Sequence, residues 1–347
     1  MKKICLIFCL LPLAAFAETD AQISLNQAIE SARLNCSGIS VRMDKIKKMA
    51  GIGTVVNAVG TATGVGGVAA GAVKYNADVK TVYAMVEKEA VDQLLEKLKG
   101  GQKEQIKLAK DLKISPNLEK NLRALVDKVN AQKEQSKKEQ VAKEHSAELQ
   151  KEIVENQKKS TTAGNVRTGM FAVDTVSNIA GAITSSQTVA DDDFIEQIKK
   201  CTDAIDALRT ARSRSKFEDG DNANVQKMDL SEKIIKKCAE YEYVNLTPLN
   251  NLAKGAMAAN SVGAATGTVA TITSALGNNK KVSNLNLHSE DGANTLNKNL
   301  KMNIASNVMG GVTAAASLTG TVLNASQIKT AKQVLNIAQE CEEALTW

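Results

Sequence analysis

Apolar residues recur at helical spacing along most of the chain, at intervals of three and four positions. The clearest runs mix Gly and Ala with Val or Ile, and they cover residues 43–73, 162–190, 248–276 and 303–327. These runs lack the strict apolar–polar alternation that is typical of a half-buried strand. We therefore expect an all-α protein whose helices pack through small side chains.

One stretch of the first run is repeated nearly unchanged in the third run. Asn57–Gly64 reads NAVGTATG and Asn260–Gly267 reads NSVGAATG, so Asn57 aligns with Asn260 and Gly60 with Gly263. This match predicts two tandem antiparallel helical hairpin units, residues 18–209 with limbs 43–73 and 162–190, and residues 229–347 with limbs 248–276 and 303–327. Residues 210–228 are rich in Ser, Arg, Asp and Asn and are expected to link the units.

Glycines within these runs lie one helical turn apart. Gly60 and Gly64 share a face with Asn57, and Gly67 and Gly71 repeat the spacing. A glycine inside a helix costs roughly 1 kcal/mol relative to Ala, so many of them need a compensating close approach of a second backbone. A flexible linker is disfavoured by the interleaved valines. The predicted helix-packing residues are Asn57, Gly60, Gly64, Gly67, Gly71, Gly181, Asn260, Gly263, Gly267, Gly311 and Gly320.

Residues 75–160 are rich in Lys and Glu and form a charged arm within the first unit. Two apolar stripes at helical spacing predict an antiparallel helical hairpin with coiled-coil character. An open alternative for the part beyond Gln132 is a single solvated helix that frays. The stripes are Val79, Val82, Val86, Ala90, Leu94 and Leu98, and then Leu118, Leu122, Leu125 and Val129.

Helix starts are marked by capping patterns. Ser24 with Gln27 predicts a capping box, and residues 229–232 predict a second one. Thr247–Pro248 predicts the start of a Gly-rich limb. Three aspartates, 191–193, are expected at a helix N-terminus, where the helix dipole favours negative charge, rather than as calcium ligands.

The N-terminus has the pattern of a signal peptide over residues 1–17, with two lysines, an apolar segment and Ala-Phe-Ala before the expected cleavage point. Four cysteines follow it, and an even number in an exported chain predicts disulfides. If each pair of limbs is antiparallel, Cys36 pairs with Cys201 and Cys238 with Cys341. A bond between Cys201 and Cys238 remains the main alternative. We expect export to the periplasm, the cell surface or the medium.

Composition excludes several classes of function. Aromatic residues make up 3% of the chain and the net charge is +6, which does not favour a nucleic-acid partner. The two histidines, His145 and His288, lie far apart, and no phosphate-binding loop or metal-binding motif is present. We therefore predict a protein without catalytic residues, cofactor or metal site.

Two functions remain. The first is a structural or interaction protein of the bacterial periplasm or cell surface, which binds a protein partner or itself through the helices and the charged arm. The alternative is a membrane-inserting helical protein, such as a pore-former or an effector, because residues 50–73, 255–277 and 303–327 are free of charge and residues 162–190 hold only Arg167 and Asp174. The abundance of Asn, Thr and Ser in the limbs argues against insertion.

Overall fold

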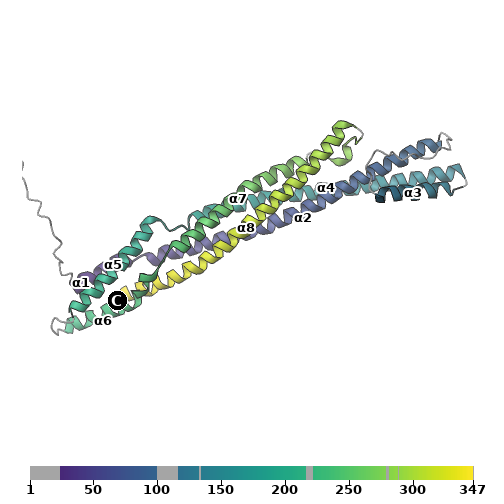
Figure 1. The fold of residues 1–347 in the computed structure, drawn as a ribbon. Coiled ribbons are helices and arrows are strands. Elements are labelled where there is room, and N and C mark those ends of the chain that lie inside the picture. The colour runs from purple at the N-terminus through teal and green to yellow at the C-terminus, as the bar shows by residue number, and fades with distance from the viewer. Residues whose placement is uncertain are drawn as a thin grey trace, which may run out of the picture. The chain divides into compact units, whose positions relative to one another are not determined.

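The computed structural model describes residues 24–99, 116–132, 134–215, 222–278, 281–287 and 289–346. These residues form helices joined by short turns, and no strand occurs among them, so the all-α class is confirmed. The helices are α1 Leu25–Cys36, α2 Ile39–Lys99, α3 Pro116–Asn130, α4 Gln135–Ser186, α5 Asp192–Ser215, α6 Asn222–Cys238, η1 Ala239–Tyr243, α7 Thr247–Asn278, η2 Val282–Asn284 and α8 Glu290–Leu345 (Figure 1). The predicted signal peptide and His288 lie outside the described residues.

Two compact units divide the chain. We call the first the disulfide unit; it comprises Met1–Lys45, Ala190–Leu246 and Ala331–Trp347. The second, the bundle unit, comprises Ile46–Val189 and Thr247–Thr330. Each unit draws on both tandem halves of the sequence, because long helices such as α2 and α8 pass from one unit into the other. The grouping into two separate hairpins is not confirmed, and the boundaries of the tandem halves stay a sequence-based prediction.

Both disulfides lie in the disulfide unit. Cys36 is bonded to Cys201 and Cys238 to Cys341, with Cα atoms 4.7 and 4.6 Å apart, so the pairing expected from the antiparallel limbs is confirmed. All four cysteines are buried, and the Sγ atoms of Cys36, Cys201 and Cys341 lie within 4.8 Å of one another. The two bridges are therefore neighbours in one small core.

Helix starts in the disulfide unit agree with the sequence in two of three cases. Ser24 and Gln27 form the predicted capping box of α1. Asp191 caps α5, since its carboxylate accepts the backbone N–H of Phe194 at 2.8 Å, and Arg42 holds the same carboxylate with two hydrogen bonds. The capping box predicted at 229–232 is wrong, because α6 already begins at Asn222 and the Ser231 hydroxyl donates to a carbonyl within the helix.

Four helical segments run side by side in the bundle unit, from α2, α4, α7 and α8 (Figure 1). Gly53 of α2 faces Thr184 and Gly67 faces Phe171, so α2 and α4 are antiparallel. Hydrogen bonds join Asn178 to Ser317 and Thr188 to Gln327 with the same sequence separation of 139, so α4 and α8 are parallel. Helix α7 is antiparallel to both, since Gly263 faces Asn178 and Gly277 faces Asn303.

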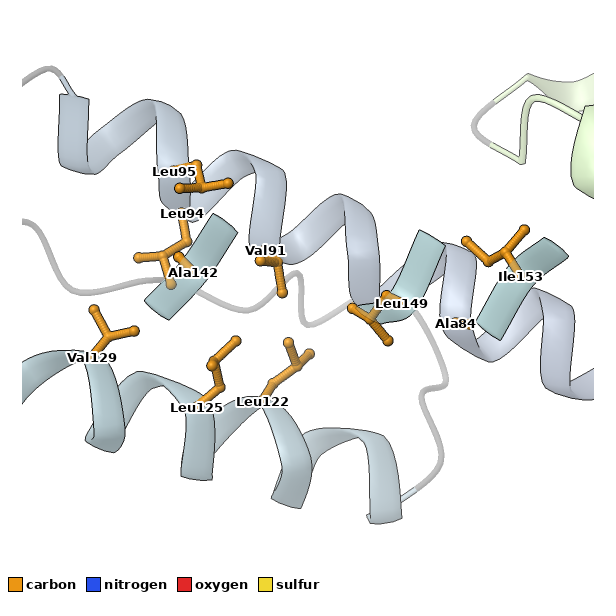
Figure 2. Close-up of a cluster of buried hydrophobic side chains, with 10 residues drawn as sticks. All are labelled: Ala84, Val91, Leu94, Leu95, Leu122, Leu125, Val129, Ala142, Leu149 and Ile153. Atoms are coloured by element: carbon orange, nitrogen blue, oxygen red, sulfur yellow. The ribbon is translucent and has the colours of Figure 1, made fainter. Parts of the chain in front are cut away.

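The charged arm is built from the end of α2, the start of α4 and α3 (Figure 2). Leu122, Leu125 and Val129 of α3 point towards α2, where Val91 and Leu94 are buried against them. The arm is therefore a three-helix cluster rather than a two-limb hairpin. Its predicted stripe on α2 is displaced, because Val86, Ala90 and Leu98 are only partly buried; the buried residues of the cluster on this helix are Ala84, Val91, Leu94 and Leu95. Gly100 to Ser115 lie outside the described residues.

Candidate functional site in the polar core of the bundle

Polar side chains fill the centre of the four-helix bundle. Each helix contributes amides, hydroxyls or charged groups that are at most 1% exposed, whereas most cores are built from aliphatic residues. The fully buried polar residues include Asn57, Asp78, Ser160, Arg167, Asp174, Asn178, Asn260, Ser274, Asn303, Ser306, Thr313, Ser317, Asn324 and Gln327. The core is therefore held by hydrogen bonds and close packing more than by aliphatic burial.

Glycines on one helix accommodate the polar side chains of another. A Cβ atom on Gly263 would lie 2.1 Å from Oδ1 of Asn178, and one on Gly71 would lie 1.8 Å from Oδ1 of Asn307. Real Cβ atoms do not approach other heavy atoms this closely. The missing side chains thus create the space that the asparagines occupy, which explains why these helices tolerate the cost of so many glycines.

Asn57 and Asn260, the residues related by the sequence repeat, meet at one level of the bundle between Gly181 and Gly320. Oδ1 of Asn57 and Nδ2 of Asn260 lie beside Gly181, whereas Nδ2 of Asn57 and Oδ1 of Asn260 lie beside Gly320. The two amides therefore face each other head to tail. None of their four polar atoms has a hydrogen-bond partner, although both residues are fully buried.

A hydrogen-bonded triad lies at the next level. The Asp174 carboxylate accepts from the Ser317 hydroxyl and from the Asn178 amide, both at 2.9 Å, and that amide also donates to Ser317 at 2.7 Å. Asp174 and Asn178 belong to α4 and Ser317 to α8. The contact crosses the centre of the bundle. Helix α2 can lie close to it because Gly60 and Gly64 carry no side chain there.

Towards the arm, a second network contains two cations and one anion. Arg167 donates to Ser274 at 2.8 Å and to Asn303 at 2.9 Å, which joins α4 to α7 and α8. Asn303 in turn donates to Asp78 at 3.2 Å, and Lys74 forms a buried ion pair with the same carboxylate at 2.7 Å. All four helices are therefore connected through one chain of charged and polar groups.

Apolar side chains cover the outside of the same four segments. On α4, Val176 is 64% exposed while its neighbours Ser177 and Asn178 are buried. The exposed large aliphatic residues are Ile52, Val55, Val59, Val65 and Val73 of α2, Val166, Val173, Val176, Ile179 and Ile183 of α4, Val262, Val269, Ile272 and Leu276 of α7, and Ile304, Val308, Val312, Leu318 and Val322 of α8. The bundle is thus polar inside and apolar outside, which reverses the usual arrangement in water.

Hydroxyl groups on the outer faces are satisfied by their own helices. Thr63 donates to the carbonyl of Val59, Thr268 to Ala264 and Thr319 to Ala315. Ser261 and Thr273 form the same type of bond one turn back. Because Ser and Thr can bond to the carbonyl four residues earlier, these side chains add little unsatisfied polarity to the outer surface.

A belt without exposed charge surrounds the bundle. On α8 it extends from Lys301 to Lys329, and on α7 from Lys254 to the end of the helix. The only charged residues of α4 between Ser160 and Ser186 are Arg167 and Asp174, both buried. At 1.5 Å per residue such segments are about 36–40 Å long, which exceeds the roughly 30 Å of a bilayer core.

Two helical stretches among the described residues are long and apolar enough to cross a membrane, Leu25–Lys99 and Glu290–Leu345. Length and composition alone would also fit a buried helix of a soluble protein. However, only 28% and 39% of the two apolar windows are buried. The windows are therefore mostly exposed, unlike a core helix.

The structure buries all but one of the predicted packing glycines and asparagines in the bundle. Gly311 is the exception, because it is exposed and a Cβ there would meet nothing within 4 Å. A Cβ on its neighbour Gly310 would instead lie 2.2 Å from the Phe171 ring. The roles of Asp174 and Arg167 were not predicted, although two isolated charges in the otherwise uncharged residues 162–190 were a usable signal.

Among the described residues, the one group of metal-ligand type consists of Cys36, Cys201 and Cys341. His145 lies in the arm, where its Nε2 is 3.0 Å from Glu87, and the three neighbouring cysteines are already bonded in disulfides. The arrangement suits helix association and burial of polar groups. No family model matches the chain, and no curated protein or solved structure shows significant similarity to it.

Proposed function

We propose that the protein is exported and inserts its four-helix bundle into a lipid membrane. The observation that carries this proposal is the reversed polarity of the bundle, with Asn, Ser, Asp and Arg inside and Val and Ile outside. In a bilayer, apolar side chains gain nothing from being buried between helices, whereas polar groups must find partners inside the bundle. Small residues at the helix contacts fit the same environment.

The compartment is part of this proposal. Two buried disulfides are compatible with an oxidising environment, in agreement with the signal peptide that the sequence predicts. The membrane would then border the periplasm or the outside of the cell. Within it, the bundle acts as an anchor or as the subunit of a larger inserted assembly.

Depth-dependent quenching tests the insertion directly. We would replace Val176 by Cys, attach an environment-sensitive dye, and reconstitute the chain into vesicles that contain lipids spin-labelled on the acyl chain. The matched control is Val154→Cys on the same helix, because Val154 is 59% exposed but lies in the charged arm. We expect strong quenching at 176 and little at 154. A soluble chain with equal, weak quenching at both positions would refute the proposal.

Leakage of a trapped dye separates an anchor from a pore-former. Vesicles that stay sealed while position 176 is quenched would identify an anchor. Rapid release of the dye would identify a pore.

The charged arm is the part that we propose to contact a protein partner or a second copy, because it has its own apolar core and a Lys- and Glu-rich surface. Analytical ultracentrifugation of the full chain against a chain with a shortened arm would test this role.

A further inference from the structure

A groove runs between α2 and α4 at the end of the uncharged belt nearest the arm. It is an open groove of about 580 Å³, and its apolar lining comes from Ala70 and Val73 of α2 with Ala163 and Val166 of α4. Val73 and Val166 also belong to the exposed aliphatic surface of the bundle. The groove therefore opens from the face that we assign to the acyl chains of the membrane.

Charged side chains line the groove at one end only. Lys158 and Lys159 precede the uncharged segment of α4, and Glu155 lies one turn earlier. Both lysines are exposed, and among the described residues neither forms an ion pair. Two ammonium groups against one carboxylate leave a net positive charge beside an apolar channel. Flexible lysines at the end of a membrane segment reach the headgroup layer while their stems cover apolar surface.

We propose that this groove binds one phospholipid with an anionic headgroup. An acyl chain would lie along Ala70, Val73 and Val166, and the phosphate would be held by Lys158 and Lys159. Basic pockets between membrane helices bind anionic headgroups in this way. With Glu155 offsetting part of the attraction, we expect roughly tenfold preference for an anionic over a zwitterionic lipid. This inference rests on the proposed membrane insertion.

The test uses native mass spectrometry of the full chain in detergent, with phosphatidylglycerol or phosphatidylcholine of matched acyl chains added at equal concentration. We expect one phosphatidylglycerol retained about tenfold better than phosphatidylcholine. The double variant Lys158→Gln/Lys159→Gln should lose this preference. The control Lys143→Gln/Lys151→Gln, at exposed positions earlier in α4, should keep it. Ala70→Trp should fill the groove and reduce retention of both lipids.

Inorganic phosphate added as competitor distinguishes a lipid site from a simple anion site. Phosphate that displaced the lipid at low millimolar concentration would overturn the proposal, as would equal retention of the two lipids by the unaltered chain. Reconstituting the same preparation into vesicles distinguishes failure of the lipid-binding proposal from failure of the proposed membrane insertion. A chain that inserts without headgroup preference refutes only the groove, whereas a chain that does not insert refutes the bundle's role.

Discussion

Single positions decide how closely the helices of the bundle approach one another. Gly310 and Gly311 are neighbours on α8, yet one faces the buried ring of Phe171 and the other faces outward. The difference arises because consecutive residues on a helix point about 100° apart, so only one of the two can lie in the contact. A glycine's role therefore depends on the direction in which it points.

Substituting these two glycines should have opposite effects. Gly310→Ala places a methyl group 2.2 Å from the Phe171 ring, which is fully buried and has no room to move, so we expect a loss of about 1–3 kcal/mol of stability. Gly311→Ala removes a glycine from a helix with nothing nearby and should gain up to about 1 kcal/mol. Chemical unfolding in detergent measures both. Equal effects of the two substitutions would contradict the observed packing.

Tyr241 in the disulfide unit should make that unit sensitive to alkali. Burial, together with the nearby Glu342 carboxylate, raises the pKa of the Tyr241 phenol above its usual value. A raised folded-state pKa of an acid favours its neutral form, so this contribution to stability is complete below about pH 10 and is lost as the pH rises further. We expect the unfolding midpoint to fall above that pH.

Matched phenylalanine variants isolate the contribution of Tyr241. Tyr241→Phe should flatten the alkaline decline, since no phenol remains to ionise in the core. Tyr243→Phe should leave it unchanged, because Tyr243 is 80% exposed. Thermal melts followed by circular dichroism between pH 8 and 11 provide the comparison. An unaltered decline in Tyr241→Phe would assign the effect to another group.

At the scale of elements, helices stabilise one another through different chemistry in different places. In the arm, α3 contributes Leu122, Leu125 and Val129 to an aliphatic core, and in the bundle α4 contributes Asp174 and Asn178 to a polar one. Helix α4 takes part in both regions. Its arm half is held by hydrophobic burial in water, whereas its bundle half is held by close packing and hydrogen bonds.

Truncation of Leu125 should loosen α3 selectively. The side chain is 7% exposed in the arm cluster, so Leu125→Ala removes buried aliphatic atoms and should cost about 2–4 kcal/mol of local stability. Lys128→Ala, an exposed position of the same helix, should have almost no effect. Hydrogen exchange of the α3 amides measures the change. Faster exchange throughout the four bundle segments as well would contradict a separate arm core.

Removal of one disulfide should weaken the disulfide unit strongly. The two bonds close loops with sequence separations of 165 and 103, which corresponds to about 4–5 kcal/mol each in the chain-entropy account. We expect Cys36→Ser/Cys201→Ser to lower the urea midpoint of this unit while amides of the bundle core stay protected. Hydrogen exchange under mild urea measures the amide protection of each unit individually. Simultaneous loss of protection in both units would show that they unfold together.

At the scale of the whole molecule, charge is distributed unevenly along the chain. Lysine and glutamate are concentrated in the arm and the disulfide unit, whereas the outer faces of the four bundle segments carry none over more than the roughly 20 residues needed to span a bilayer. A soluble monomer gains no stability from such a surface. We therefore expect this uneven distribution of charge to determine whether the bundle lies in water or in lipid.

One charge placed on the outer face distinguishes the two solvents. In a bilayer, Val176→Arg should lower the inserted fraction of the protein, because a charged residue at the centre of a membrane helix costs about 2.5–3.5 kcal/mol on insertion scales. Val154→Arg on the same helix, in the charged arm, should insert normally. Flotation of vesicles measures the bound fraction. Equal flotation of the two variants would place the outer face of the bundle in water.

Much of the local structure could be predicted from residues alone. Helical periodicity and the lack of alternation indicated the all-α class, and Ser24 with Gln27 indicated the start of α1. The disulfide pairing followed from the antiparallel order of the limbs. These features depend on short-range geometry, because the spacing of residues sets which of them share a helix face and which backbone N–H groups a side chain reaches.

Only the tertiary structure decided which segments meet at the packing faces of the bundle helices. Along α2, the predicted Asn57 and Gly60 face is buried, whereas Val55 and Val59 are exposed. The partners of that face come from distant segments, since Gly181 and Gly320 leave space that fits the Asn57 and Asn260 amides. The reversed polarity, the three-helix arm and the shared location of both disulfides all arise from contacts between segments distant in sequence. Periodicity along one helix carries no information about these contacts.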